Sequence, residues 1–270
     1  MRGGLIGFLT LAIPVCAGLV YLLAYDAPPH YAAVNAAALG LAGLWIALAP
    51  PLSSLARRVT IAAALVLLFL PLAVGPSLDG VARWVPLGPF KLHAGMVAIP
   101  VLAVLAAQER EHAPALLSVA LLAALLQPDL ASGAALTLAA LGLYDATKDS
   151  RYGGFAVVAF TASLVAAVRG ELPAQPYADR VIFLLARTDP LAALGLLAAL
   201  ALSFYLMVGA LPGRESSRKA LGGALFGFSF AGLVSNYPSA LVGYGASPIL
   251  GFGLAIGLLR TTGRQALEPN

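Results

Sequence analysis

The stretch MRGGLIGFLTLAIPVCAGLVYLLAY, residues 1–25, decides how the rest of the chain is interpreted. Its apolar part runs for about 20 residues, the length that a helix needs to cross the hydrocarbon core of a bilayer. The apolar core of a secretory signal peptide is shorter, so we interpret this stretch as a retained first span. Cys16 lies inside the run without a second cysteine or a metal-ligand pattern, and is interpreted as a small buried or lipid-facing residue.

The composition of all 270 residues agrees with that interpretation. Hydrophobic residues make up 60% and charged residues 10% of the chain, and the mean hydropathy is +0.91. A soluble domain carries roughly 25% charged residues. The net charge of +4 is not concentrated in a Lys/Arg cluster dense enough to predict nucleic-acid binding. The sequence therefore predicts an all-α, polytopic membrane protein that forms a single membrane domain over residues 1–270.

Apolar runs indicate ten candidate spans, at residues 4–25, 31–49, 59–75, 93–107, 114–127, 132–145, 153–168, 190–211, 220–236 and 240–259. Several are shorter than the roughly 20 residues of a typical crossing. The pair 114–127 and 132–145 is the weakest, and forms either two short crossings inside the bundle or a hairpin that does not fully cross. Both alternatives leave every later loop on the same side of the membrane.

The distribution of basic residues predicts that both termini are cytoplasmic. Inside loops then hold 11 of the 16 Lys and Arg residues, in line with the positive-inside rule: Arg2, Arg57, Arg58, Arg110, Lys148, Arg151, Arg214, Arg218, Lys219, Arg260 and Arg264. The other five lie in or beside two outer loops, about 76–92 and 169–187: Arg83, Lys91, Arg169, Arg180 and Arg187.

Those five outer basic residues run against the charge trend. One explanation is an anionic ligand at the outer leaflet, because guanidinium groups bind phosphate through charge-assisted, bidentate hydrogen bonds. The alternative is that they extend to outer headgroups or pair with nearby acids. The candidate acids are Asp79, Glu171, Asp179 and Asp189.

Three polar segments interrupt the apolar pattern on the predicted outer side. In RGELPAQPYADRVIFLLARTDP, residues 169–190, Asp179 could act as a general base, hold a divalent cation with a phosphate, or form a surface pair with Arg180. In LLQPDLASGAAL, residues 125–136, Asp129 follows a helix-breaking proline and could cap the next helix. SNYPSALVGYGASPIL, residues 235–250, could expose backbone groups to a cavity, or could be ordinary turn and helix-packing sequence. The histidines are dispersed, so no metal cluster is predicted.

Four segments in the same order resemble motifs of the SEDS family of RodA/FtsW-like cell-wall polymerases. GVARWVPLGPFKLHAGM, residues 80–96, resembles the first half of the family stretch G-A-R-R-W-I-x-L-G-x-F-x-x-Q-P-S-E. LLQPDLASGAAL resembles L-Q-P-D-L-G-T-A, and LPAQPYADRVIF resembles L-P-E-x-H-T-D-F-I-F. NYPSALVGYGASPILGFGLAIGLL is a shortened counterpart of P-x-x-G-x-x-x-P-F-x-S-Y-G-G-S-S. The resemblance covers residues 80–260, and ten spans with cytoplasmic termini fit it.

The resemblance implies an integral membrane protein of cell shape and division that polymerises lipid II by glycosyl transfer. Asp179 would deprotonate the acceptor hydroxyl, and Arg83 and Lys91 would stabilise the pyrophosphate of the leaving group. The other substrate-binding residues implied are Trp84, Asp129, Arg187, Tyr244 and Ser247. No cofactor is required, although a divalent cation is compatible with the site, and a groove between spans would hold the prenyl chain.

The implied partners are lipid II, membrane lipids and a class B penicillin-binding protein, with no nucleic acid. The implied location is the bacterial inner (cytoplasmic) membrane, as a multi-pass protein.

The departures from the family pattern keep other functions open. His93, Ala94, Gly95 and Met96 stand where the family has Gln-Pro-Ser-Glu, and Ile99 replaces a lysine. The outer loop is shortened, and Thr188 and Asp189 replace an acidic pair. An alternative is a catalytically degenerate SEDS-like protein that binds lipid-linked precursor or regulates a cell-wall complex. A transporter of a small or lipid-linked anion is a third hypothesis, without a positive signal in the sequence.

Overall fold

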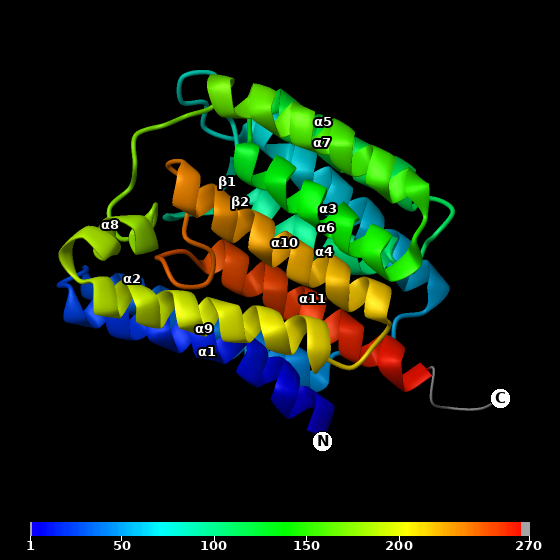
Figure 1. Ribbon diagram of the computed structural model, residues 1–270, viewed down its shortest axis with the longest axis horizontal. Coiled ribbons are helices and arrows are strands. Elements are labelled where there is room, and N and C mark those ends of the chain that lie inside the picture. Colours follow the sequence, from blue (N-terminus) through cyan, green and yellow to red (C-terminus); the bar gives the residue numbers. More distant parts are fainter. Residues whose placement is uncertain (1, 266–270) are drawn as a thin grey trace.

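The computed structural model describes residues 2–265, and the side chains of residues 3–259, as a bundle of helices with one small hairpin (Figure 1). The first helices are α1 (Arg2–Ala24), α2 (Pro29–Leu48) and α3 (Ser54–Val74). The antiparallel strands β1 (Trp84–Leu87) and β2 (Phe90–His93) follow. The remaining helices are α4 (Ala94–Ala106), α5 (Ala113–Leu126), α6 (Leu130–Thr147), α7 (Ser150–Arg169), α8 (Val181–Thr188), α9 (Pro190–Gly209), α10 (Glu215–Val234) and α11 (Ala246–Gln265).

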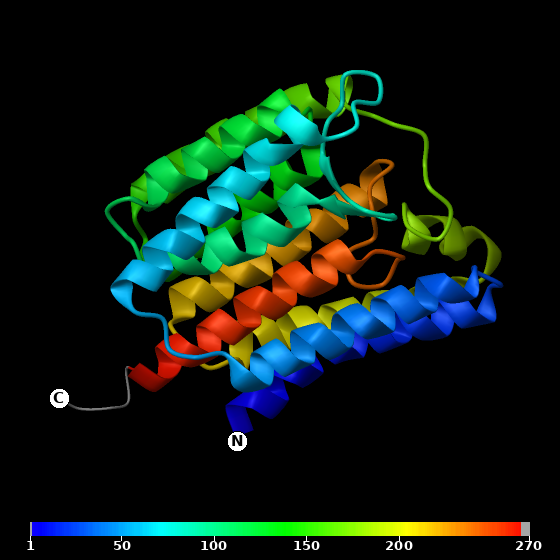
Figure 2. The ribbon, with the colours of Figure 1, turned by 180° about the vertical axis from the view of Figure 1, so that it is seen from behind.

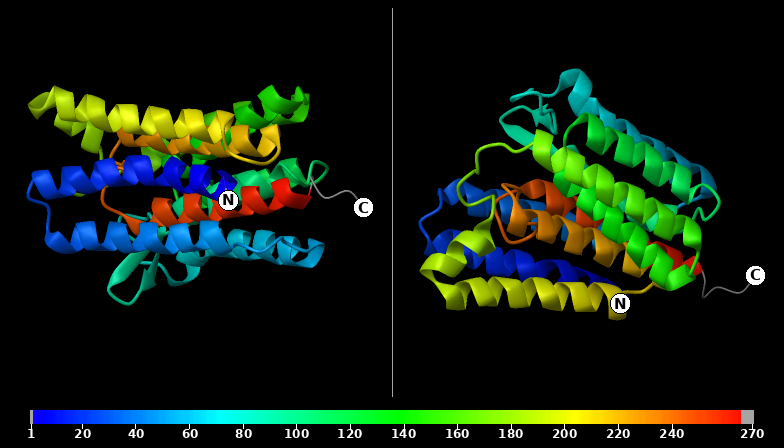
Figure 3. Two further views of the ribbon diagram at one scale, coloured as in Figure 1. Left: turned by 90° about the horizontal axis from the view of Figure 1, so that it is seen from below. Right: turned by 45° about the horizontal axis from the view of Figure 1, so that its top comes forward.

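The longer helices run back and forth between two ends of the bundle. The β1–β2 hairpin, α8 and the loop 235–245 lie at one end, and the start of α1 and the end of α11 lie toward the other (Figures 1 and 2). We call these the hairpin end and the termini end. Under the predicted orientation, the hairpin end is the outer side of the membrane. The hairpin and α8 lie on opposite faces of that end, as the view from below shows (Figure 3).

Helix length and side-chain exposure define a multi-pass membrane protein. In the described part of the chain, six helices, α1, α2, α3, α6, α7 and α9, are long and apolar enough to cross a membrane. Large apolar side chains such as Val20, Val66 and Leu191 are mostly exposed, as expected for a surface that faces lipid. The predicted all-helical, membrane-spanning fold class is confirmed.

The weakest predicted pair consists of two separate helices. Helix α5 has 14 residues and spans about 21 Å at 1.5 Å per residue, less than the roughly 30 Å hydrocarbon core. Helix α6 packs closely on α10 because glycine lets the backbones approach: a Cβ at Gly227 would collide with the backbone of Ala134 and Ala135. Helix α4 is shorter still, with all 13 of its residues buried at the centre of the bundle.

Three local features differ from the ranges expected from hydropathy. The last span begins at Ala246 instead of residue 240, because 237–245 form a buried loop. The side chain of Asn35 on α2 holds that loop by donating to the Gly243 carbonyl and accepting from the Gly245 N–H, each at 3.0 Å. The two outer loops also contain regular structure, the β1–β2 hairpin and α8, which hydropathy did not reveal.

Candidate active site at the hairpin end

Arg83 lies just before β1 and is only 2% exposed. Its Nη2 donates to the Pro128 carbonyl at 2.6 Å and to the Gly170 carbonyl. The guanidinium carbon lies 4.6 Å from the centroid of the Tyr237 ring, within the range of a cation–π interaction. Arg83 therefore joins the α5–α6 junction, the end of α7 and the loop before α11.

Asp129 caps helix α6, as its position after Pro128 predicted. Its Oδ1 accepts from the Ser132 N–H at 3.2 Å, and its Oδ2 accepts from the Ser132 hydroxyl. Nε2 of His93 lies 3.6 Å from the same Oδ2, while Nδ1 of His93 accepts from the Met96 N–H at 3.4 Å and caps α4. Two helix N-termini are thus capped by side chains that face each other.

His93 is interpreted as neutral in this arrangement. Its Nδ1 accepts a hydrogen bond at 3.4 Å, which a doubly protonated imidazolium cannot do. Because Nδ1 accepts a hydrogen bond from the Met96 N–H, the neutral ring carries its proton on Nε2, directed toward Asp129.

Asp179 is buried in the short loop between α7 and α8. Its Oδ2 accepts from the Gln175 N–H at 2.8 Å, and its backbone pairs with Pro238. Ser239 pins the same loop, because its N–H donates to the Ala178 carbonyl at 2.8 Å and its hydroxyl accepts from the Val181 N–H at 2.9 Å. Burial raises the pKa of the Asp179 carboxyl, while the Gln175 hydrogen bond and the Arg83 charge partly oppose the rise. A carboxylate of raised pKa is a stronger base than an exposed aspartate.

Tyr237 connects these groups. Its hydroxyl accepts from the Leu130 N–H at 3.0 Å at the start of α6, and its ring lies against the Arg83 guanidinium. Its backbone carbonyl accepts from the Arg180 N–H, next to Asp179. Burial raises the pKa of the Tyr237 phenol, so the hydroxyl stays neutral. Neither Tyr237 nor His93 was singled out as a site residue from the sequence; the prolines beside Tyr237 and the basic loop before His93 were the local signals.

Five of the predicted site residues gather around this centre. Ser247 accepts from the backbone N–H of His93 at 2.9 Å, and the Trp84 ring lies 6.0 Å from both the His93 ring and the Arg83 guanidinium carbon. Hydrogen bonds, ring contacts or electrostatic interactions link the whole group: Arg83, Trp84, Asp129, Asp179 and Ser247.

The other three predicted residues lie at the margins. Lys91 is exposed on β2, and Arg187 is exposed on α8, so the two lie on opposite faces of the hairpin end (Figure 3). Tyr244 stacks on Tyr31 of α2, with ring centroids 3.6 Å apart and planes 6° from parallel. The eight predicted residues therefore do not form one compact site.

In the part of the chain that the structure describes, the outer basic residues do not form the ion pairs with nearby acids that were one part of the alternative, and their extension to lipid headgroups stays a prediction. Among the described side chains, none of the five pairs with a carboxylate; the ion pairs involve other cations. Asp189 instead accepts from the Tyr25 hydroxyl at 2.6 Å, and Glu171 accepts from the Ser235 hydroxyl at 3.3 Å.

The metal-ligating side chains of the described part are not clustered either. No group of three His, Cys, Asp or Glu residues lies close enough there to hold a metal ion.

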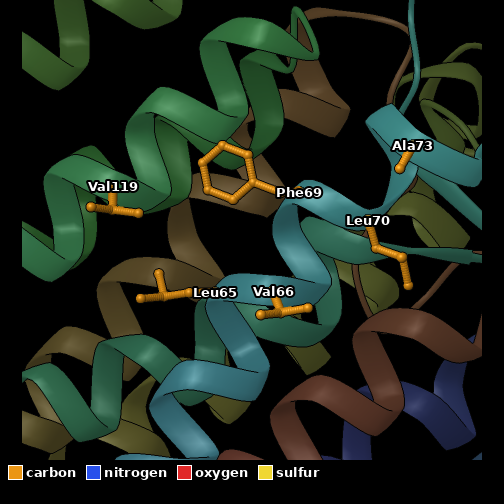
Figure 4. A pocket seen from close by; sticks show the side chains of 6 residues that line it. All are labelled: Leu65, Val66, Phe69, Leu70, Ala73 and Val119. Atoms are coloured by element: carbon orange, nitrogen blue, oxygen red, sulfur yellow. The ribbon is translucent and has the colours of Figure 1, made fainter.

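An apolar hollow of about 460 Å³ lies between α3 and α5 (Figure 4). It is formed by the side chains of Leu65, Val66, Phe69, Leu70, Ala73 and Val119. Helix α3 continues from this hollow toward the loop that carries Arg83. An aliphatic chain is the kind of molecule that such a lining accommodates.

Together, the helices and the buried polar cluster define a multi-pass membrane protein with a candidate site at one end. No protein-family model and no curated protein matches the sequence. Solved structures do match over almost the whole chain. An Asp-to-Ala variant of the rod shape-determining protein RodA from Thermus thermophilus superposes with a TM-score of 0.73 at 24% identity, covering 98% of both chains.

Two further structures show the same likeness. RodA from Thermus thermophilus without that substitution gives a TM-score of 0.69 at 21% identity, over 98% of this chain and 97% of that one. A chain from a peptidoglycan synthase complex, described as coordinating polymerization and crosslinking, gives 0.67 at 23% identity over 98% of both chains. The chain therefore has the SEDS-type fold of RodA, as its sequence motifs predicted.

Proposed function

We propose that this protein is a SEDS-like enzyme of cell-wall synthesis in the bacterial inner membrane, which polymerises lipid II by glycosyl transfer. The observation that carries the proposal is the place of Asp179 within the RodA fold. Asp179 lies in the segment that resembles the family motif, its carboxylate is buried with a raised pKa, and the charge of the buried Arg83 acts on it. The sugar part of a lipid-linked precursor lies at that level.

In the proposed reaction, Asp179 takes the proton from the acceptor sugar hydroxyl as that oxygen attacks the anomeric carbon of the donor. The bond from that carbon to the pyrophosphate oxygen breaks, and the prenyl pyrophosphate leaves. Arg83 acts mainly by fixing the loops that carry the site, because its Nη2 is engaged by two carbonyls. Lys91, exposed on the hairpin, is free to approach the leaving group.

The hollow between α3 and α5 supports a lipid-linked substrate. It is apolar throughout and lies on a helix that leads to the site. We propose that it holds part of the prenyl chain. We also propose a class B penicillin-binding protein as partner, because one structural match comes from a complex that coordinates polymerization and crosslinking.

A specific observation also supports the degenerate alternative, a protein that binds precursor without polymerising it. Met96 and Ile99 stand at the positions of the family's glutamate and lysine, and both are completely buried on α4. Apolar packing thus replaces a charged pair beside the site.

The test is polymerisation of labelled lipid II by the purified protein in liposomes, with and without divalent cations. We expect the Asp179→Asn variant to lose activity by about 10²-fold or more, the usual contribution of a general base. Asp26→Asn is the matched control, since Asp26 is an exposed aspartate at the same end. Polymerisation that survives Asp179→Asn contradicts the assigned base. Absence of polymer under all conditions, with saturable precursor binding, establishes the degenerate alternative.

A further inference from the structure

Two arginines on α8 share one aromatic ring. The guanidinium carbon of Arg180 lies 4.0 Å from the centroid of the Phe183 ring, and that of Arg187 lies 4.6 Å from it. The separation of the two guanidinium carbons therefore cannot exceed the sum of their distances to the ring centroid. Like charges at such a separation repel each other unless an anion compensates them.

No carboxylate of the described chain provides that compensation. Neither arginine forms an ion pair there, and Nε of Arg180 is buried without a hydrogen-bond partner. The nearest acid in sequence to Arg187 is Asp189, which the Tyr25 hydroxyl and the Ala192 N–H occupy. An unpaired charge is open to a partner from outside the chain where its side chain is accessible; Arg187 is exposed and Arg180 is partly exposed.

The backbone of Arg180 is held in an unusual conformation. Its φ of 53° lies in the left-handed region, which is uncommon for a residue with a side chain. Its N–H donates to the Tyr237 carbonyl at 3.2 Å, so the candidate site itself holds this conformation. Arg180 directly follows Asp179, which couples its position to that of the proposed base.

We infer that Arg180 and Arg187 bind the phosphate group of a membrane lipid at the hairpin end. Phe183 keeps one guanidinium carbon 4.0 Å and the other 4.6 Å from the centroid of its ring, and guanidinium donors match phosphate oxygens bidentately. Helix α8 immediately precedes α9, a helix that can span the membrane, so a phosphate bound there lies at the level of the lipid headgroups. On the proposed function, the phosphate is the pyrophosphate of the lipid-linked sugar donor, which these arginines would then bind in place of Lys91 on the opposite face; an ordinary anionic headgroup offers the same chemistry.

Binding to liposomes tests this site without requiring catalysis. Full-length protein with Asp179→Asn is reconstituted into phosphatidylcholine vesicles that contain a fluorescently labelled polyprenyl diphosphate, labelled phosphatidylglycerol or no anionic lipid, and energy transfer from its tryptophans to the label measures binding. Adding Arg180→Gln and Arg187→Gln should weaken binding to diphosphate vesicles by about tenfold or more. The matched control is Arg169→Gln with Arg110→Gln, which removes the same charge from two exposed arginines away from Phe183 and should change binding by less than about twofold.

The outcomes separate the two sources of phosphate. Weakening on diphosphate vesicles alone supports the site and identifies the substrate pyrophosphate, whereas equal weakening on phosphatidylglycerol supports it as a headgroup site. The inference is overturned if the Arg180/Arg187 variant binds both vesicles as the control does. The exposed single variant Arg187→Gln, with its thermal unfolding compared with the parent, provides the same test if the double variant does not fold. Failure of polymerisation leaves this result unaffected, because every protein compared already carries Asp179→Asn.

Discussion

At the termini end, several basic side chains pair with carboxylates near the surface, whereas at the hairpin end none of the described Lys and Arg side chains pairs with Asp or Glu. Lys219 bonds to Asp145 at 2.7 Å and to Glu215 at 2.6 Å, and Arg57 bonds to Glu109 at 2.7 Å, all with partly exposed side chains. At the hairpin end, Arg83 is directed to backbone carbonyls and Arg180 to an aromatic ring. The same residue types therefore serve different purposes at the two ends.

The difference in burial decides what each arrangement can contribute. When two exposed charges pair, they lose part of their hydration, and water and salt weaken their attraction. Such pairs therefore contribute little to stability. A buried donor shared between two carbonyls fixes the relative position of three chain segments, and its loss leaves polar groups unsatisfied away from water. Buried polar groups thus hold chain segments together at the hairpin end, while the ion pairs at the termini end lie near the surface and contribute little to stability.

Arg83→Ala should give the largest effect on stability. It removes the donor from two buried carbonyls and leaves a cavity beside Tyr237, at a cost of roughly 3–5 kcal/mol. Unfolding in mild detergent, followed by fluorescence, measures the change. Lys91→Ala is the control, because Lys91 is an exposed basic residue of the same outer loop and should leave stability almost unchanged. Equal unfolding of the two variants would refute the role assigned to Arg83.

Asp179→Asn should raise stability at neutral pH by a smaller amount. Burial raises the pKa of Asp179 in the folded protein, so folding favours the protonated carboxyl. The resulting stability is fully present below the pKa of the unfolded chain, near 3.9. It is lost as the pH rises through the higher pKa of the folded protein. Asparagine cannot ionise and can still accept from the Gln175 N–H. We expect a melting temperature higher by roughly 2 °C at pH 7. The gain should shrink as the pH approaches 4; a constant difference would mean that ionisation of Asp179 is not its cause.

Hydropathy predicted the helical spans well because a span depends on residues close together in sequence. The candidate site was predicted only in part, because its contacts join distant segments. Arg83 bonds to residues 45 and 87 positions away, and Asn35 fixes a loop that is 208 residues downstream. The local sequence does not indicate that Arg83 is buried and binds two carbonyls while Lys91, eight residues later, is exposed.

The start of the last helix shows that hydropathy can also assign too many residues to a span. Residues 240–242 are apolar, so hydropathy assigned them to a span, yet they form the buried loop that Asn35 holds. Apolar composition predicts burial but does not distinguish a helix from a loop packed inside the bundle. Helix α8 was missed because eight residues are too few for a hydropathy signal.

Lys219→Ala should give the smallest effect, although it breaks two ion pairs at once. Asp145 and Glu215 are more than half exposed, so solvent screens both pairs. We expect the melting temperature to change by about 1 °C or less, and the change to vanish at high salt. A double-mutant cycle with Asp145→Ala isolates the pair from the lost lysine side chain. A coupling as large as the effect of Arg83→Ala would break the distinction between the two ends, because it would show that the exposed pairs also hold the bundle together.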